Sequence, residues 1–197
     1  MTGAPRPTEV VLVRHASTTW SGRRYCGMSD PPLDDAGRRQ AMDLAAGLIP
    51  TVPDDARLIS SPSRRAVETA AAIATALGHD PAQVEIDARW SEADFGVAEG
   101  LTFDELSAIA PVLATRLVDG TVAIDWPGGE TAAALAARVA AAWRDLVADG
   151  RPAVVVSHAG PLRLAIGLAD GCPPDRVEMP TPAGVRRRTL GVPPSRA

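Results

Sequence analysis

Two short apolar runs constrain the fold of this chain more than any other feature. Residues 10–13 read Val-Val-Leu-Val and residues 153–156 read Ala-Val-Val-Val, and a histidine stands two positions after each run, at His15 and His158. Unbroken apolar runs of this length are typical of strands that are buried on both faces of a sheet. Because ligands bind beyond the carboxyl ends of the strands in such sheets, we expect both histidines to lie at a site.

Helical patterns alternate with the predicted strands. Apolar residues recur at the spacing of an amphipathic helix over 34–50, 63–78 and 131–150, a short helix is predicted over 161–171, and short strands over 56–62 and 84–90. In the helix over 131–150, Arg138 and Asp145 are expected opposite the apolar stripe, which includes Val147. The alternation predicts an α/β fold, a three-layer αβα sandwich with a mostly parallel open sheet and helices on both faces.

The length of 197 residues suits a single domain over 1–197. A helical insert is expected at about 101–130, with its helix over about 102–118, and residues 191–197 are expected to form a frayed tail. No run approaches the ~18 apolar residues of a membrane span. Cys26 and Cys172 have neither a metal-ligand spacing nor the pattern of a disulfide framework. We therefore expect a soluble cytoplasmic protein without contact to a membrane.

Charge narrows the classes of partner. The formal net charge is -4, and all 20 basic residues are arginine. The acidic balance argues against nucleic-acid binding. Because every basic residue is arginine, each cationic side chain is a planar guanidinium that suits phosphate or carboxylate. The basic cluster at 186–188 is expected to be a solvated strand edge or tail.

The surroundings of the two strand-end histidines favour an anion over a metal. Neither His15 nor His158 has a neighbouring carboxylate or a third imidazole at ligand spacing, and Arg14 beside His15 would repel a cation. We expect no metal and no cofactor, and the natural ligand is a phosphate dianion. His79, in a Gly-His-Asp-Pro loop, has no such context and is expected to be solvated.

Several motifs in a fixed order then resemble one family. Arg14-His15-Ala16 resembles the Arg-His-Gly signature of the histidine phosphatase superfamily (phosphoglycerate mutase-like, branch 1). The segments RRYCGMSDPPLDDAGRRQA, SSPSRRAVETA, SEADFGVAEG, PGGET and VVVSHAGPLR resemble further motifs of that family. The resemblance implies that the helical insert is a cap that selects the substrate.

The resemblance also implies roles for single residues. His15 would be the nucleophile and Glu92 the proton donor to the leaving oxygen. The phosphate would be held by Arg14, Arg65 and His158. Substrate-binding residues by the same resemblance are Ser21, Tyr25, Cys26, Gly27 and Ala159. Glu99 is expected to be a solvated acid or a structural hydrogen-bond partner.

Three residues depart from the family pattern. Ala16 replaces the usual Gly, which adds a methyl group where the backbone would approach phosphate. Ser21 stands where an Asn is common and can still donate from its hydroxyl. Cys26 occupies a position that commonly holds Thr, Ser or Gln. The last two changes bear on the choice of substrate and not on the central chemistry.

The predicted function is a metal-independent phosphoric monoester hydrolase of the histidine acid phosphatase type. It would act through a phosphohistidine on a small phosphorylated metabolite. A phosphoglycerate mutase is the first alternative, although the segment after Glu92 lacks the Arg-His-Tyr-Gly continuation of glycolytic mutases. A non-catalytic phospholigand-binding module is the second. The identity of the monoester and the existence of a homodimer are left open by the sequence.

Overall fold

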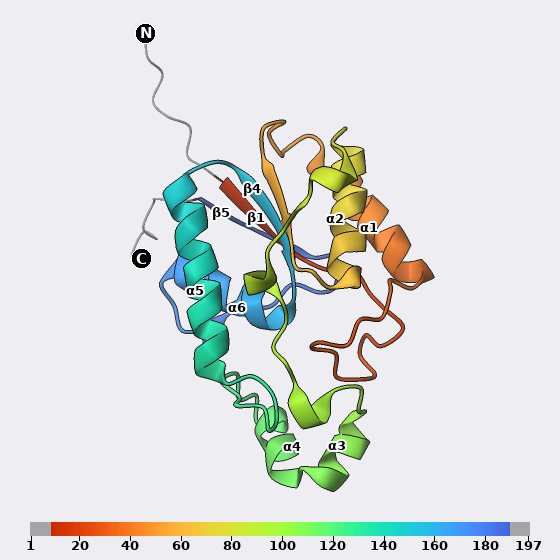
Figure 1. Cartoon of the computed structure of the whole chain (residues 1–197), viewed down its shortest axis with the longest axis vertical. Helices are drawn as coiled ribbons and strands as arrows, with labels where there is room; N and C mark the ends of the chain where they lie inside the picture. The colour runs from red at the N-terminus through yellow and green to blue at the C-terminus, as the bar shows by residue number, and fades with distance from the viewer. Residues whose placement is uncertain (1–8, 190–197) are drawn as a thin grey trace.

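The sheet is built around the two apolar runs. The computed structural model describes residues 9–189 and contains a five-stranded sheet in the order β3-β2-β4-β1-β5 (Figure 1). The strands are β1 (Glu9–Arg14), β2 (Arg57–Ser60), β3 (Glu85–Ile86), β4 (Ala153–Ser157) and β5 (Val185–Thr189). The first four are parallel, and β5 runs antiparallel to β1 at one edge. The two apolar runs are neighbouring inner strands, with Val10 paired to Ala153 and Val13 to Val156.

Helices cover both faces of this sheet (Figure 1). They are α1 (Asp35–Leu48), α2 (Arg64–Ala76), α5 (Ala132–Asp149) and α6 (Ala159–Asp170). Side chains of a strand alternate between the two faces. Val11 and Val13 therefore pack in one core with α1 and α2, and Val10 and Leu12 pack in the other core with α5 and α6. The predicted αβα sandwich with a mostly parallel sheet is confirmed.

Two short helices form a cap beyond the end of the sheet (Figure 1). They are α3 (Phe103–Ile109) and α4 (Pro111–Val118). The cap has its own small core, which includes Leu106, Leu113 and Ile124 and is separate from the two cores of the sheet. The helix predicted over 102–118 is two helices because Pro111 restrains Ala110 to a non-helical conformation (φ -139°, ψ 63°).

Two local predictions were wrong. The strand predicted over 84–90 has two residues, because the carboxylate of Asp87 accepts a hydrogen bond from the backbone N–H of Arg89 and starts a 3₁₀ turn over Ala88–Trp90. Val147 was assigned to the buried stripe of α5 but is 43% exposed. It lies about 100° around the helix from the buried Leu146, which carries it past the edge of the buried face.

The basic cluster 186–188 lies in the edge strand β5, and a strand edge is one of the two positions that the sequence predicts for it. Arg187 forms an ion pair with Glu9, and Arg188 forms one with Asp170 at 2.5 Å. The tail predicted at 191–197 lies outside the described residues. Within residues 9–189, no helix has the length and apolarity needed to cross a lipid bilayer.

Candidate active site

Five titratable or charged side chains gather at the carboxyl ends of β1, β2 and β4. They are Arg14 and His15 at the end of β1, Arg65 in the first turn of α2, Glu92 in the loop after the 3₁₀ turn Ala88–Trp90, and His158 after β4. The ring centroids of the two histidines are 5.0 Å apart. The meeting of the histidines at this edge of the sheet is what the two apolar strands predicted.

The imidazole of His15 has a fixed tautomer. Its Nδ1 lies 2.7 Å from the carbonyl oxygen of Ala16, and a carbonyl can only accept, so Nδ1 carries the hydrogen and Nε2 keeps a lone pair. Burial, together with the positive charges of Arg65 and Arg14, lowers the pKa of His15 to about 3 against the opposing hydrogen bond to Ala16. The ring is therefore neutral near pH 7 and can act as a nucleophile.

Arg65 and His158 form a buried hydrogen-bonded pair. The side chain of Arg65 is 1% exposed, and its Nη2 lies 3.2 Å from Nδ1 of His158. Because a guanidinium only donates, Nδ1 accepts, and Nε2 of His158 donates to the hydroxyl of Ser61 at 2.7 Å. Burial lowers the pKa of His158 well below its usual value. Sequence reasoning gave Ser61 no role, although it stands in the same motif as Arg65.

Two buried donors at this site have no partner. Among the described residues, Nε of Arg14 and Nε of Arg65 are buried side-chain atoms without a hydrogen bond. Nη1 of each guanidinium donates to a backbone carbonyl, of Pro180 at 3.1 Å for Arg14 and of Ser29 at 2.7 Å for Arg65. An unpaired buried donor is costly, and an oxyanion accepts from such groups strongly. The pair of free Nε–H groups fits the oxygens of a phosphoryl group.

Glu92 is a buried carboxyl group with a raised pKa. It is 6% exposed, and burial raises its pKa against the opposing effects of two backbone N–H donors and of the charges on Arg65 and Arg14. The donors are Ala93 at 3.0 Å and Gly160 at 3.2 Å. A Cβ at position 160 would lie 2.4 Å from Oε1 of Glu92, so only glycine leaves room for this contact. A carboxyl group that keeps its proton to higher pH is suited to general acid catalysis.

Arg138 holds the chain that leads into Glu92. The guanidinium forms a bidentate ion pair with Glu130, at 2.8 Å for each bond, and donates to the carbonyls of Ser91 at 2.7 Å and Glu92 at 3.0 Å. It was predicted to lie opposite the apolar stripe of α5, and its side chain is only 21% exposed. The helical period identifies the face of Arg138 but not the loop that covers this face.

The matches to known proteins agree with this geometry. The model of the histidine phosphatase superfamily (branch 1) matches residues 10–186. The chain belongs to this superfamily. A probable phosphoglycerate mutase of Escherichia coli is 37% identical over 173 residues, which are 83% of this chain and 72% of that protein.

Two further matches come from mycobacteria. A bifunctional protein of Mycobacterium tuberculosis is 37% identical over 166 residues, which are 83% of this chain but 44% of that protein, so the chain spans less than half of this relative. The structure of mycobacterial glucosyl-3-phosphoglycerate phosphatase with VO3 superposes with a TM-score of 0.78 and 28% identity, over 91% of this chain and 92% of that one.

In this member of the superfamily, Glu99 orders the loop that holds Arg65. Its carboxylate accepts five hydrogen bonds, from the backbone N–H groups of Gly27, Met28, Ser29 and Phe95 and from the hydroxyl of Ser29. Carbonyls of the same loop, at Gly27 and Ser29, accept from Arg65 at 2.9 and 2.7 Å. Of the two expected roles of Glu99, the structural hydrogen-bond partner is the one found.

Replacing Glu99 with glutamine is expected to lower the free energy of unfolding by about 1–3 kcal/mol, because an amide leaves some of these donors unpaired. We expect kcat/KM to fall by up to about 100-fold, since Arg65 loses its fixed position. Burial opposes ionisation of Glu99, but its hydrogen bonds lower the pKa of the carboxyl overall. The loss of stability should therefore be full above the usual pKa of Glu and shrink as pH falls below it.

The control for this variant is Glu178→Gln, at a side chain that is 93% exposed. Denaturant unfolding from pH 3 to 8 measures both variants, and the control should match the parent at every pH. Equal stability of Glu99→Gln and Glu178→Gln would contradict the role of Glu99.

Three of the predicted substrate-binding residues lie in the loop of Arg65 or near it. Gly27 and Cys26 offer their carbonyl oxygens to Nη2 of Arg65 at 2.9 and 3.3 Å. Ser21 is exposed, and its hydroxyl accepts from the backbone N–H of Thr18 at 2.9 Å. The first two residues thus position Arg65 through their backbones, and substrate contact by all three stays a prediction.

The other two predicted residues lie around the cap. Tyr25 packs with Phe95 and Trp126, each at a ring-centroid distance of 6.2 Å. Ala159, in the first turn of α6, lines a cavity next to Glu92. Contact of either residue with a substrate stays a prediction.

The methyl group of Ala16 is accommodated by the core. Ala16 is fully buried and packs with Leu33 and Ala41, while its N–H donates to the hydroxyl of Thr69 at 3.1 Å. The departure from Gly therefore adds a core contact at this position.

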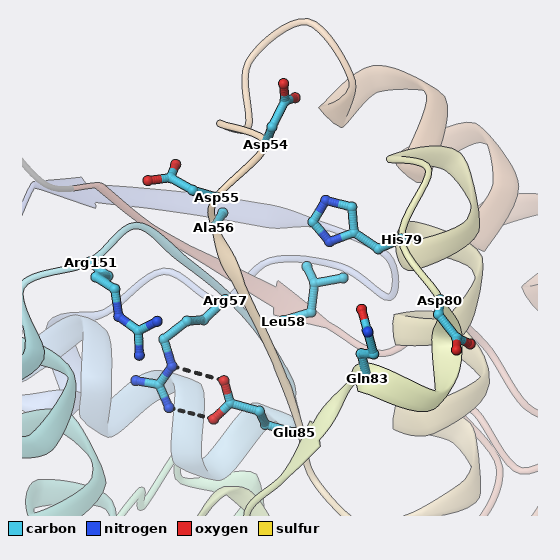
Figure 2. A pocket seen from close by; sticks show the side chains of 10 residues that line it. All are labelled: Asp54, Asp55, Ala56, Arg57, Leu58, His79, Asp80, Gln83, Glu85 and Arg151. Carbon is cyan, nitrogen blue, oxygen red and sulfur yellow. Dashed lines mark hydrogen bonds and ion pairs between the residues drawn. The ribbon is translucent and has the colours of Figure 1, made fainter.

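A second hollow, of about 250 Å³, lies at the opposite end of β2, around Arg57 and His79 (Figure 2). Arg57 forms a bidentate ion pair with Glu85, at 2.9 and 2.5 Å, and a further one with Asp149 at 2.9 Å. Its guanidinium is therefore already engaged and does not offer a phosphate clamp. Within residues 9–189, no group of three or more His, Cys, Asp or Glu side chains could hold a metal ion.

Proposed function

We propose that this member of the histidine phosphatase superfamily is a phosphomonoesterase. It transfers the phosphoryl group of a small monoester first to His15 and then to water. The observation that carries the proposal is the neutral His15, whose lone pair on Nε2 is free because Nδ1–H is held by the carbonyl of Ala16. The buried and unpartnered Nε–H groups of Arg14 and Arg65 supply the donors for the phosphoryl oxygens.

In the first step, Nε2 of His15 attacks phosphorus and an N–P bond forms. The ester P–O bond breaks, its electron pair moves to the leaving oxygen, and this oxygen takes the proton of Glu92 to give an alcohol. Arg14 and Arg65 donate to the equatorial oxygens, where charge is concentrated in the transition state.

In the second step, water attacks phosphorus while the carboxylate of Glu92 accepts its proton. The N–P bond breaks, its electron pair returns to Nε2, and inorganic phosphate leaves. Neither step uses a metal ion. The thiols of Cys26 and Cys172 are free and form no disulfide, which suits a reducing compartment such as the cytoplasm.

The second candidate function is a mutase, because a relative of 37% identity is named a probable phosphoglycerate mutase. A mutase would return the phosphoryl group of His15 to a second hydroxyl of the same kind of substrate in place of water. Phosphate release and isomerisation therefore separate the two candidates.

The test is phosphate release from a panel of monoesters in EDTA, run beside an isomerisation assay with 3-phosphoglycerate. The proposal expects release that survives the chelator and little isomerisation. Isomerisation much faster than release would favour the mutase. Saturable binding of monoesters by folded protein with neither reaction would leave a phospholigand-binding module.

A further inference from the structure

A cavity of about 870 Å³ opens beside Glu92, between the first turns of α5 and α6 and the cap. Its apolar wall includes Phe95, Ile124, Trp126, Leu135 and Leu164. The rings of Phe95 and Trp126, which belong to this wall, pack with centroids 4.2 Å apart and planes inclined by 33°. A cavity of this size and lining is typical of a site for a small apolar ligand.

The cavity begins at the group that acts on the leaving oxygen. Glu92 and Gly160 both line it. A Cβ placed on Gly160 would lie 2.4 Å from Oε1 of Glu92 and 3.5 Å from Cδ2 of Leu135. The carboxyl group of Glu92 and the apolar side chain of Leu135 therefore both lie next to Gly160. If Glu92 protonates the leaving oxygen, this cavity is the space next to Glu92 that the carbon skeleton bonded to that oxygen can occupy.

The charges of the cavity do not suit a second anion. Apart from Glu92, its charged lining is Asp119, Arg163 and Asp175, a formal charge of -1. Nη1 of Arg163 already donates to the carbonyls of Pro174 at 3.3 Å and Val177 at 2.8 Å. A carboxylate or second phosphate on the leaving group would meet two acids and a single guanidinium that is partly engaged. An uncharged leaving group avoids this repulsion.

We propose that this cavity binds the leaving group and selects monoesters of apolar, uncharged alcohols, alkyl or aryl, over esters of acidic or polyhydroxylated alcohols. The proposal rests on the proposed function for its orientation, since it takes Glu92 as the acid. It assigns the choice of substrate to the side chains that line the cavity from α5, α6 and the cap.

Binding is tested with unbranched alkylphosphonates from methyl to octyl, which cannot lose phosphate. Calorimetry is expected to give an affinity that rises roughly three- to fourfold for each added methylene group, until the cavity is filled. An affinity that does not depend on chain length, or tighter binding of phosphonoacetate than of propylphosphonate, would overturn the proposal.

Turnover is tested in parallel with the matching alkyl phosphates, whose leaving alcohols have nearly equal acidity, and with glycerol phosphate and 3-phosphoglycerate. The value of kcat/KM should rise with chain length as the phosphonate affinity does, and both polar esters should lie below butyl phosphate. Hydrolysis that does not depend on chain length would support the proposed phosphatase function and contradict the apolar subsite. Binding that depends on chain length without any hydrolysis would support the subsite and contradict the phosphatase function.

The cavity offers a matched pair of leucines for mutation. Leu164 lines it, and Leu168 lies one turn later on α6 with 48% of its surface exposed. Leu164→Asn is expected to reduce the gain in affinity and in kcat/KM per added methylene group toward onefold. Leu168→Asn should leave the full dependence on chain length. Leu135→Asn provides a second lining variant, and an unchanged gain in both lining variants would contradict the assignment.

Discussion

Replacing His15 with alanine is expected to lower kcat/KM for every phosphate monoester by at least about 10⁴-fold, because the attacking lone pair is removed and no other group replaces it. The matched control is His79→Ala, the histidine that lines the hollow at the far end of β2 (Figure 2). This control should keep the activity of the parent. Phosphate release by both variants, measured over the whole panel of esters, checks the prediction.

Two further readouts separate a nucleophile from a residue that only supports the fold. A labelled phosphoryl group should be trapped on the parent protein as an adduct that survives alkali and is lost in acid, and His15→Ala should give none. Loss of activity with labelling retained would mean that another side chain receives the phosphoryl group.

The stability of the fold should also report on His15. Its pKa is lowered from 6.5 to about 3, so the unfolded chain takes up a proton below about pH 6.5 while the folded chain does not. Stability contributed by the neutral ring is therefore lost as pH falls from about 6.5 toward 3. His15→Ala should lose less stability over this range than the parent does.

Replacing Glu92 with glutamine is expected to have an effect that depends on the leaving group. Phosphoryl transfer from ethyl phosphate should slow by about 10²–10⁴-fold, because an alkoxide leaves poorly without a proton. Transfer from 4-nitrophenyl phosphate should slow far less, since its phenolate leaves without one. The burst of 4-nitrophenol and the single-turnover rate for ethyl phosphate measure the first step in each case.

The control for Glu92→Gln is again the exposed acid Glu178, whose replacement by glutamine should change neither rate. An equal loss for both esters in Glu92→Gln would assign to Glu92 a task other than protonation of the leaving oxygen. Burial raises the pKa of Glu92, so an ionised carboxylate destabilises the folded chain as pH rises above the usual pKa of Glu. Near neutral pH, Glu92→Gln should therefore be at least as stable as the parent.

The parts of the fold that the sequence predicts are those with a local cause. The runs at 10–13 and 153–156 identify strands because four apolar residues in succession need burial on both faces. The short length of β3 is not predicted in this way, because the strand ends where the carboxylate of Asp87 accepts a hydrogen bond from Arg89. The hydrogen-bond partners of Arg138 are not predicted from the sequence either, since the carbonyls of Arg89 and Ser91 reach α5 only in the folded chain.

The residues of the candidate site also differ in whether the sequence predicts them. The apolar strands point to His15 and His158, while the resemblance to the family adds Arg65 and Glu92. Glu99 carries little local sign of its task, because four of the five hydrogen bonds that it accepts come from residues 27–29, about 70 positions away, and only Phe95 is a near neighbour in the sequence. A sequence pattern shows that an acid is present but not how many donors surround it.

The separate core of the cap has a consequence for how enzymes of this kind diversify. Leu106, Leu113 and Ile124 pack with each other, apart from the side chains that hold the sheet and its helices together. Mutations that reshape the cap can therefore accumulate in a lineage while the reaction machinery keeps its geometry. New substrates become accessible by replacement of one small module, and a chimaera that carries the cap of a relative on this platform should still fold.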